Sequence, residues 1–386
     1  MINIFPEEPK RLGEYYRYSS VIESPRSGSQ MLWFDVPEEY RSWVTPRADP
    51  FLIAHIFPLM LEGENVHVHG DISASLLEPL LGYMDIWRSW RPGRCHSFTI
   101  SVDSELEDYV PATSDTVLLF SGGLDAQTTL QRHIRGDAGA RSRRIGACVY
   151  ARGFMNGLDD SPRYRSALKN AQESVAEFAG RETPVIPIVS NWEESNHDTM
   201  PDSIGGGLIA FLHLFKAQFS RGMLSSSVSI KGGGTYGSHP FSDPLLGHGN
   251  FEIECDDVTS SRPEKALYLS DKPEVLDRLL ICHDFDDRAR NCGKCEKCFR
   301  TALCFLVEGK PVPDSIRIDW QACKEQGLLY RVFWSAPESC EYMFKKIRAE
   351  GLRHPELIRF RNRYQFYITK RRLDDLLMTL RFKSSP

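Results

Sequence analysis

Short apolar runs alternate with helix-like patterns between residues 111 and 310. Such an alternation is typical of a parallel sheet whose strands are buried beneath helices on both faces. Apolar positions recur every three or four residues over 164–178, which predicts an amphipathic helix that Gly180 ends. The segment 207–219 is apolar on nearly every side and predicts a buried helix. The expected strands are 116–120, 145–150, 184–189 and 225–230.

The segment before this alternation, 1–110, mixes strand-like and helical patterns. Strands are expected at 14–22, 30–36, 64–69 and 97–102, and a helical apolar face spans 76–87, with Asp71 or Ser73 as its N-terminal cap. The segment after it, 311–386, is helical in period and basic. We therefore predict an α+β N-terminal region (1–110), a central α/β domain (111–310) and a basic helical C-terminal region (311–386).

The amino-acid composition limits the class of protein to which the chain can belong. Hydrophobic residues make up 41% of the 386 positions and charged residues 26%, as in folded globular proteins. No apolar run reaches the roughly 18 residues of a membrane span, and charges occupy the place of a signal peptide. We expect a cytoplasmic protein with no membrane partner. The net charge of −5 gives no general attraction to nucleic acid.

The charge is distributed unevenly along the chain. Residues 345–386 carry 12 Lys or Arg and 4 Asp or Glu, a local charge of +8. This segment is either a surface for an acidic partner or a set of solvated helix faces.

A glycine pair follows the first central strand. Residues 116–120 run directly into Ser-Gly-Gly-Leu-Asp, and a helical pattern begins near Asp125. Glycines let the chain approach a ligand closely, and the amides that open a helix attract phosphate. Phosphate repels a carboxylate, so Asp125 is assigned to magnesium or to orienting the loop. The residues expected at this phosphate site are Ser121, Gly122, Gly123, Leu124, Asp125 and Thr128.

Two further observations bear on this loop. The chain has no G-x-x-x-x-G-K-S/T motif, which excludes the usual P-loop. The competing interpretation is a tight turn that needs glycine only for its geometry.

Four of the ten cysteines are clustered. Cys282, Cys292, Cys295 and Cys298 lie within seventeen positions, and four thiolates at this spacing predict a tetrahedral zinc site. A closed site has no position for water, so its expected role is structural. The alternatives are an iron–sulfur cluster, unrelated free cysteines, and His283 in place of one cysteine as a ligand.

The two motifs together carry a family resemblance. Residues 121–125 resemble the S-G-G-x-D-S pyrophosphate loop of the PP-loop (N-type) ATP pyrophosphatases, although Ala126 stands where that family usually has serine. With the cysteine spacing of 282–298 added to this loop, the chain resembles the 7-cyano-7-deazaguanine synthase (QueC) family over about residues 115–308. Arg262-Pro-Glu-Lys265 is similar to a segment of that family that binds ATP phosphates.

The resemblance implies ATP and Mg²⁺ as well as structural Zn²⁺. It implies that the enzyme adenylates a deazaguanine-type carboxylate, such as 7-carboxy-7-deazaguanine, and couples it to an amine. Asp125 and Lys265 would be catalytic, with Arg262 and Lys265 on the phosphates. The chain departs from the family at 200–207 and 237–244, which points to an altered substrate or acceptor. The residues expected to contact this substrate are Ser238, His239 and Asp243.

Long relatives of this kind occur in bacterial antiphage operons. The resemblance implies an operon-encoded protein partner whose N-terminal amine accepts the deazaguanine, and a homodimer is compatible with it. Three alternatives remain: a nitrile-forming synthase that uses ammonia, a tRNA-modifying enzyme that grips RNA with the +8 segment, and an inactive zinc-clipped binding module.

Overall fold

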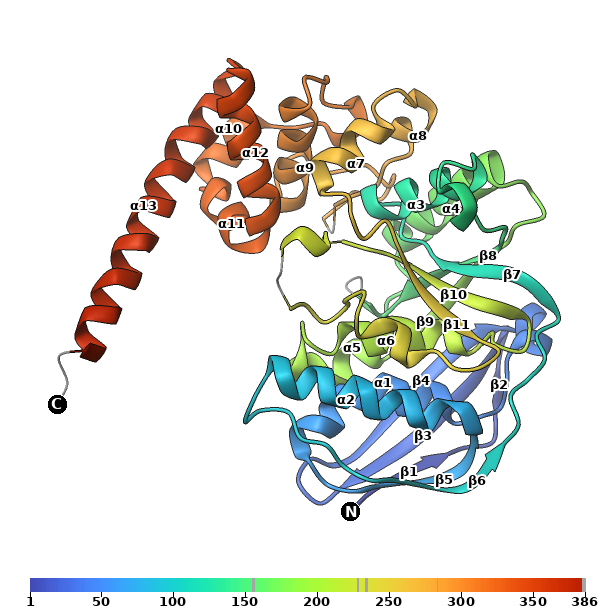
Figure 1. Ribbon diagram of the computed structural model, residues 1–386. Coiled ribbons are helices and arrows are strands. Elements are labelled where there is room, and N and C mark those ends of the chain that lie inside the picture. Colours follow the sequence, from blue (N-terminus) through green and yellow to red (C-terminus); the bar gives the residue numbers. More distant parts are fainter. Residues whose placement is uncertain (155–156, 228, 233–234, 283, 384–386) are drawn as a thin grey trace. The chain divides into compact units, whose positions relative to one another are not determined.

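A computed structural model of the protein describes residues 1–154, 157–227, 229–232, 235–282 and 284–383. The chain divides into two compact units. The sheet unit comprises residues 1–258 with 287–289, and the helical unit comprises residues 259–286 with those that follow 289. Figure 1 shows both units.

The sheet unit is built on one α/β sheet. In the part of the chain that the structure describes, this sheet has eleven strands, in the order β11-β10-β7-β8-β9-β4-β3-β1-β5-β6, with β2 beside β3. The strands are β1 (Ile2–Pro6), β2 (Lys10–Leu12), β3 (Tyr15–Ser24), β4 (Gly28–Pro37), β5 (Val66–Ser73), β6 (Ile100–Leu106), β7 (Thr113–Leu119), β8 (Ile145–Arg152), β9 (Val185–Ser190), β10 (Phe219–Ser225) and β11 (Glu252–Asp256).

Five consecutive strands of this sheet are parallel, from β11 through β10, β7 and β8 to β9. Helices α3 (Leu124–Ile134) and α4 (Pro162–Phe178) connect β7, β8 and β9 in one direction, and α6 (Ile204–His213) leads back across the sheet to β10. Because parallel crossovers are right-handed, reversing direction places α6 on the face opposite α3 and α4. The reversal falls between β7 and β10, which makes this pair the topological switch point of the parallel strands.

The N-terminal strands continue the same sheet. Strand β4 pairs antiparallel with β9, and β3, β1, β5 and β6 follow it. Helices α1 (Asp49–Glu62) and α2 (Leu77–Trp90) belong to this region, and α1 packs against α6. The segments 1–110 and 111–258 therefore share one sheet and one apolar core.

Most expected elements are present at nearly the expected places. Strands β7, β8 and β9 and helix α4 are confirmed, and the sheet they form is parallel with helices on both faces. The strand expected at 225–230 was wrong, because β10 lies earlier in the chain. Arg221 interrupts the apolar pattern of β10, and its charge is met by Glu254 of β11 at 3.2 Å.

The expected cap of α2 was also wrong. Asp71 and Ser73 belong to β5, and a short 3-10 turn separates them from the helix. The backbone N–H of Ser73 donates instead to the Asp49 carboxylate of α1 at 2.9 Å. Ser73 is thus held by Asp49, a residue distant in the sequence, and does not cap α2 as the local pattern predicted.

The helical unit carries its own apolar core. Its helices are α7 (Arg262–Leu269), α8 (Pro273–Asp277), α9 (Glu296–Val307), α10 (Trp320–Glu325), α11 (Leu328–Ser335), α12 (Pro337–Glu350) and α13 (Pro355–Lys383). Phe299, Leu303, Val332 and Phe360 are buried within this core. The helical prediction for 311–386 is confirmed. No described helix has the combination of length and apolar character that crossing a bilayer requires.

Three consecutive glycines let α6 pack closely on its neighbours. A methyl group on Gly207 would lie 2.3 Å from the Trp192 ring, and one on Gly206 would lie 2.6 Å from the Ile53 carbonyl oxygen. We expect Gly207→Ala to destabilise the protein by about 1–3 kcal/mol in urea denaturation, because overpacking outweighs the helix propensity gained. Gly82→Ala in α2 is the matched control, since its methyl group would meet only the flexible Leu245 at 3.4 Å.

Candidate functional site

The glycine loop leaves the carboxyl end of β7 and opens α3. Gly122 has φ +74°, a left-handed conformation that favours glycine, and Gly123 is the residue before the first turn of α3. The N–H of Gly123 donates to the Ser121 hydroxyl at 3.4 Å, and the Ser121 side chain is exposed. The loop adjoins the reversal point between β7 and β10, where open α/β sheets bind their ligands.

The residues after the loop divide into accessible and internal ones. Asp125 is half-buried in the first turn of α3, whereas Leu124, Ala126 and Thr128 are buried. The Thr128 hydroxyl donates to the Leu124 carbonyl at 2.8 Å, so its proton is used within the helix. Ser121 and Asp125 are therefore the accessible polar side chains among the expected loop residues.

The other residues expected at the phosphates lie in the helical unit. Arg262 is the first residue of α7, and Lys265 follows one turn later with a side chain that is only 1% exposed. Ser261 and Glu264 form a capping box, with the Ser261 N–H donating to the Glu264 carboxylate at 2.7 Å. This box fixes the start of the helix and so the positions from which Arg262 and Lys265 project.

The three residues expected to contact substrate lie together in the sheet unit. The buried Asp243 carboxylate accepts hydrogen bonds from the Ser238 hydroxyl at 2.6 Å and from the His239 N–H at 3.0 Å. The Ser242 hydroxyl and the Cys255 thiol also donate to it, at 3.3 and 3.4 Å. Asp243 thus holds the loop in shape, and the His239 ring packs on Trp90 of α2, with ring centroids 4.7 Å apart.

An arginine from the N-terminal region braces this neighbourhood. Arg91, just after α2, donates to the Asp202 carboxylate at 2.9 and 3.2 Å and to the Thr235 hydroxyl at 2.6 Å. Asp202 lies in the segment 200–207, which departs from the resembled family. Arg91 thus joins the N-terminal region to the segment 200–207, and Trp90 joins it to 237–244 through the His239 ring. Sequence reasoning missed both contacts because neither residue has a local signature.

Burial gives Asp243 a testable pH signature. Burial raises its pKa from 3.8 to about 6, against the hydrogen bonds of Ser238 and His239, which lower it. The folded state therefore holds this proton more tightly, so the contribution of Asp243 to stability falls as pH rises from about 4 to about 6. We expect Asp243→Asn to remove this loss, up to about 3 kcal/mol at pH 7. Urea unfolding of both proteins from pH 4 to 7 measures it, and parallel pH profiles would contradict the assignment.

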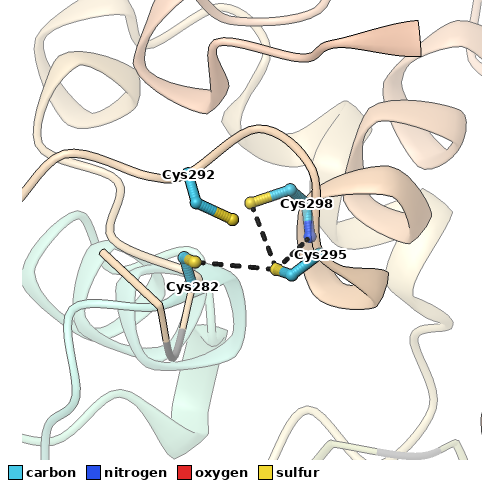
Figure 2. Close-up of side chains that lie close together, drawn as sticks. All are labelled: Cys282, Cys292, Cys295 and Cys298. Carbon is cyan, nitrogen blue, oxygen red and sulfur yellow. Dashed lines mark hydrogen bonds between the residues drawn. The ribbon is translucent and has the colours of Figure 1, made fainter. Parts of the chain in front are cut away.

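The cysteine cluster is assembled in the helical unit, as Figure 2 shows. The ligand sulfurs of Cys282, Cys292, Cys295 and Cys298 all lie within 4.8 Å of one another. Cys282 Sγ lies 3.6 Å from Cys295 Sγ, which lies 3.5 Å from Cys298 Sγ. Zinc–sulfur bonds of about 2.3 Å in a tetrahedron separate sulfurs by roughly 3.8 Å. The four cysteines can therefore hold a metal ion such as zinc, as the spacing predicts. His283 lies outside the described residues.

A helix N-terminus and neighbouring thiols favour thiolate at Cys295. Cys295 is the residue before α9, and its sulfur accepts the Cys298 N–H at 3.5 Å. Hydrogen bonds from the Cys282 and Cys298 thiols lower the pKa of Cys295, and the same sharing raises the pKa of Cys282 to about 12. Hydrogen bonds from neighbouring thiols can stabilise one thiolate, at Cys295. A bound divalent cation would stabilise thiolates at the other three cysteines as well.

Two residues outside the ligand set shape the cluster. The buried Asn291 side chain accepts from the N–H groups of Ile281 and Cys282 and donates to the carbonyls of Leu279 and Ser315 at 2.7 and 2.8 Å. Sequence reasoning missed this clamp, although its place beside Cys292 was a signal. Gly293 has φ +69°, and a methyl group there would lie 1.9 Å from the Arg317 carbonyl oxygen. Glycine at position 293 therefore permits the turn between Cys292 and Cys295.

No protein-family model, curated protein sequence or solved structure matches the chain. The interpretation of its function therefore rests on its own residues and their geometry.

Proposed function

We propose that this protein is a PP-loop ATP pyrophosphatase that adenylates a deazaguanine-type carboxylate and joins it to an amine. The observation that carries this proposal is the Ser-Gly-Gly-Leu-Asp loop between β7 and α3, beside the reversal point of the parallel sheet. Its amides and the N-terminal end of α3 suit an anion. The motif resemblance supplies the identity of that anion, pyrophosphate.

The proposed chemistry solves a leaving-group problem. A carboxylate resists attack by an amine because oxide is a poor leaving group. In the first step a carboxylate oxygen attacks the α-phosphorus of ATP, the bond to the β-phosphate oxygen breaks, and pyrophosphate leaves. In the second step the amine attacks the acyl carbonyl, AMP leaves with the bonding electron pair, and the amine loses a proton. ATP cleavage thus drives formation of an amide.

The scheme gives roles to several of the expected residues. The amides of Gly122 and Gly123 and the Ser121 hydroxyl would receive the departing pyrophosphate. The family resemblance alone assigns neutralisation of phosphate charge to Lys265. The carboxylate of Asp125 would be a ligand for Mg²⁺, which neutralises phosphate charge. Ser238 and His239 would line the carboxylate side, on the loop that Asp243 braces.

The proposed acceptor is the N-terminal amine of a partner protein in antiphage defence. Support comes from the segments in which the chain departs from the resembled family, 200–207 and 237–244, and from Arg91 and Trp90 of the N-terminal region, which contact Asp202 and His239 of these segments. Segments that differ from the resembled family, in contact with an additional N-terminal region, suit an acceptor larger than ammonia. The four-cysteine site is proposed as a structural clip that takes no part in the reaction.

The test is pyrophosphate release by the purified chain with ATP, Mg²⁺ and 7-carboxy-7-deazaguanine. Reactions contain ammonium or a protein encoded beside this chain, and products are identified by mass spectrometry. Pyrophosphate release with a deazaguanine adduct on the protein's N-terminus supports the proposal. Rapid formation of free 7-cyano-7-deazaguanine from ammonium supports the nitrile-forming alternative instead. Binding of ATP without pyrophosphate release under any condition identifies an inactive binding module.

A further inference from the structure

Two histidines and an aspartate meet on the face of the sheet opposite its apolar core. Residues Ile2, Ile4, Val66 and Val68 of β1 and β5 are fully buried in the core. Side chains alternate along strands, so the intervening residues point the other way. His67 and His69 of β5 lie on that second face, and Asp103 of β6 joins them there.

The three side chains converge on one point. His67 Nε2 lies 2.9 Å and His69 Nδ1 lies 3.9 Å from the same oxygen, Oδ1 of Asp103. One ligand atom from each residue can be chosen so that all lie within 4.8 Å of one another. A tetrahedral ion with bonds of about 2.0 Å spaces its ligands roughly 3.3 Å apart. Small side-chain rotations therefore suffice to close the site around an ion.

Each imidazole has a hydrogen-bond partner on the ring nitrogen other than the one nearest Asp103. The Ser101 hydroxyl lies 2.8 Å from His67 Nδ1 and can accept its proton while donating to the Val66 carbonyl at 3.3 Å. In that tautomer the lone pair of His67 is on Nε2, 2.9 Å from Asp103 Oδ1. Such outer partners, which hold the second ring nitrogen, are typical of histidines that ligate metals.

His69 is oriented in the same way from the other side. Its Nε2 lies 3.1 Å from the Asn3 side-chain oxygen, an acceptor, which places the proton on Nε2 and the lone pair on Nδ1. Phe5 stacks on the ring with centroids 4.2 Å apart and planes 5° from parallel. The pairing of β5 with β6 also shifts register between Val68 and Asp71, the stretch of β5 that contains His69. Irregularities of this kind re-aim side chains next to functional sites.

Asp103 faces both imidazoles, and a metal ion between the three side chains would use one nitrogen of each histidine and the carboxylate as ligands. A single proton would satisfy one histidine–carboxylate contact, whereas a metal ion satisfies all three ligands. We propose that His67, His69 and Asp103 bind a divalent transition metal of the zinc class. Imidazole nitrogens suit Zn²⁺, Co²⁺ or Fe²⁺ and disfavour Mg²⁺ and Ca²⁺. The side chains are 23, 35 and 54% exposed, so further coordination positions face solvent.

Equilibrium dialysis of the untagged full chain against Zn²⁺, with elemental analysis, tests this second site. We expect His69→Ala and the near-isosteric Asp103→Asn each to bind one ion fewer per chain than the wild type. His197→Ala, which removes an exposed histidine of the sheet unit, should bind as many as the wild type. Ser101→Ala should weaken this ion alone by about 10–100-fold, because it removes only an outer partner.

Cobalt separates this site from the cysteine cluster. When zinc is retained at the thiolates, added Co²⁺ should show visible absorption without the charge-transfer bands of cobalt–thiolate bonds, and His69→Ala should abolish that absorption. Equal ion counts in the wild type, His69→Ala and Asp103→Asn would overturn the proposal and leave the cluster as a hydrogen bond between His67 and Asp103. Neither result depends on adenylation activity.

Discussion

Replacing Cys295 by serine is expected to release the metal of the four-cysteine site and to unfold residues 280–310 while the sheet unit stays folded. The Cys295 sulfur contacts two other ligand sulfurs, so replacing it opens the site, whereas serine can still cap the start of α9. Structural zinc contributes apparent free energies of about 10–16 kcal/mol in zinc-finger peptides, so losing it removes most of the local stability. Hydrogen exchange with elemental analysis measures both effects.

The most informative amides are those of Ile281 and Cys282, which the Asn291 side chain binds. They should lose protection in Cys295→Ser. Cys340→Ser is the matched control, because it changes a buried thiol of the same unit that donates to the Val332 carbonyl, a bond that serine can keep. A Cys295→Ser protein that retains protection at 280–310 would contradict the structural role of the metal.

Replacing Asp125 by asparagine is expected to lower the rate of pyrophosphate release at least about 100-fold. The change keeps the size of the side chain but removes the charge that the proposed Mg²⁺ requires, and lost transition-state stabilisation of this kind costs about 10²–10³ in rate. Stability should fall by only about 0.3–1 kcal/mol, because Asp125 is a half-buried acidic residue in the first turn of α3. Initial rates at saturating ATP measure the effect.

Asp137→Asn provides the control for Asp125. Asp137 is an exposed residue in the turn after α3, at the end of the helix away from the glycine loop. The Asp137→Asn protein should release pyrophosphate at the wild-type rate. If Asp125→Asn were equally active while remaining folded, Asp125 would have no part in binding the metal or orienting the loop.

The N-terminal region has a structural role that its sequence did not predict. Its strands extend the central sheet through the β4–β9 pairing. Arg91 and Trp90 contact the two segments that differ from the resembled family, at Asp202 and His239. We interpret the segment 1–110 as part of the wall beside the candidate site. An appended domain would instead have its own sheet and core.

The sequence by itself determined those features whose information is local in the chain. The cysteine spacing predicted a cluster, because a loop and one helix turn suffice to gather Cys292, Cys295 and Cys298. The apolar runs of β7, β8 and β9 predicted a parallel sheet, because strands buried on both faces have no polar side. The Ser-Gly-Gly-Leu-Asp stretch predicted a strand-to-helix loop for the same local reason.

Only the tertiary structure decided features that depend on distant partners. Strand β10 can contain the charged Arg221 because Glu254 of the neighbouring strand forms an ion pair with it. Helix α1 is buried on nearly all sides, so it has no amphipathic period to reveal it. The His67, His69 and Asp103 cluster joins two strands that lie far apart in the sequence. Pairing between distant segments sets these neighbours, and a pattern within one segment carries no information about which segment will lie beside it.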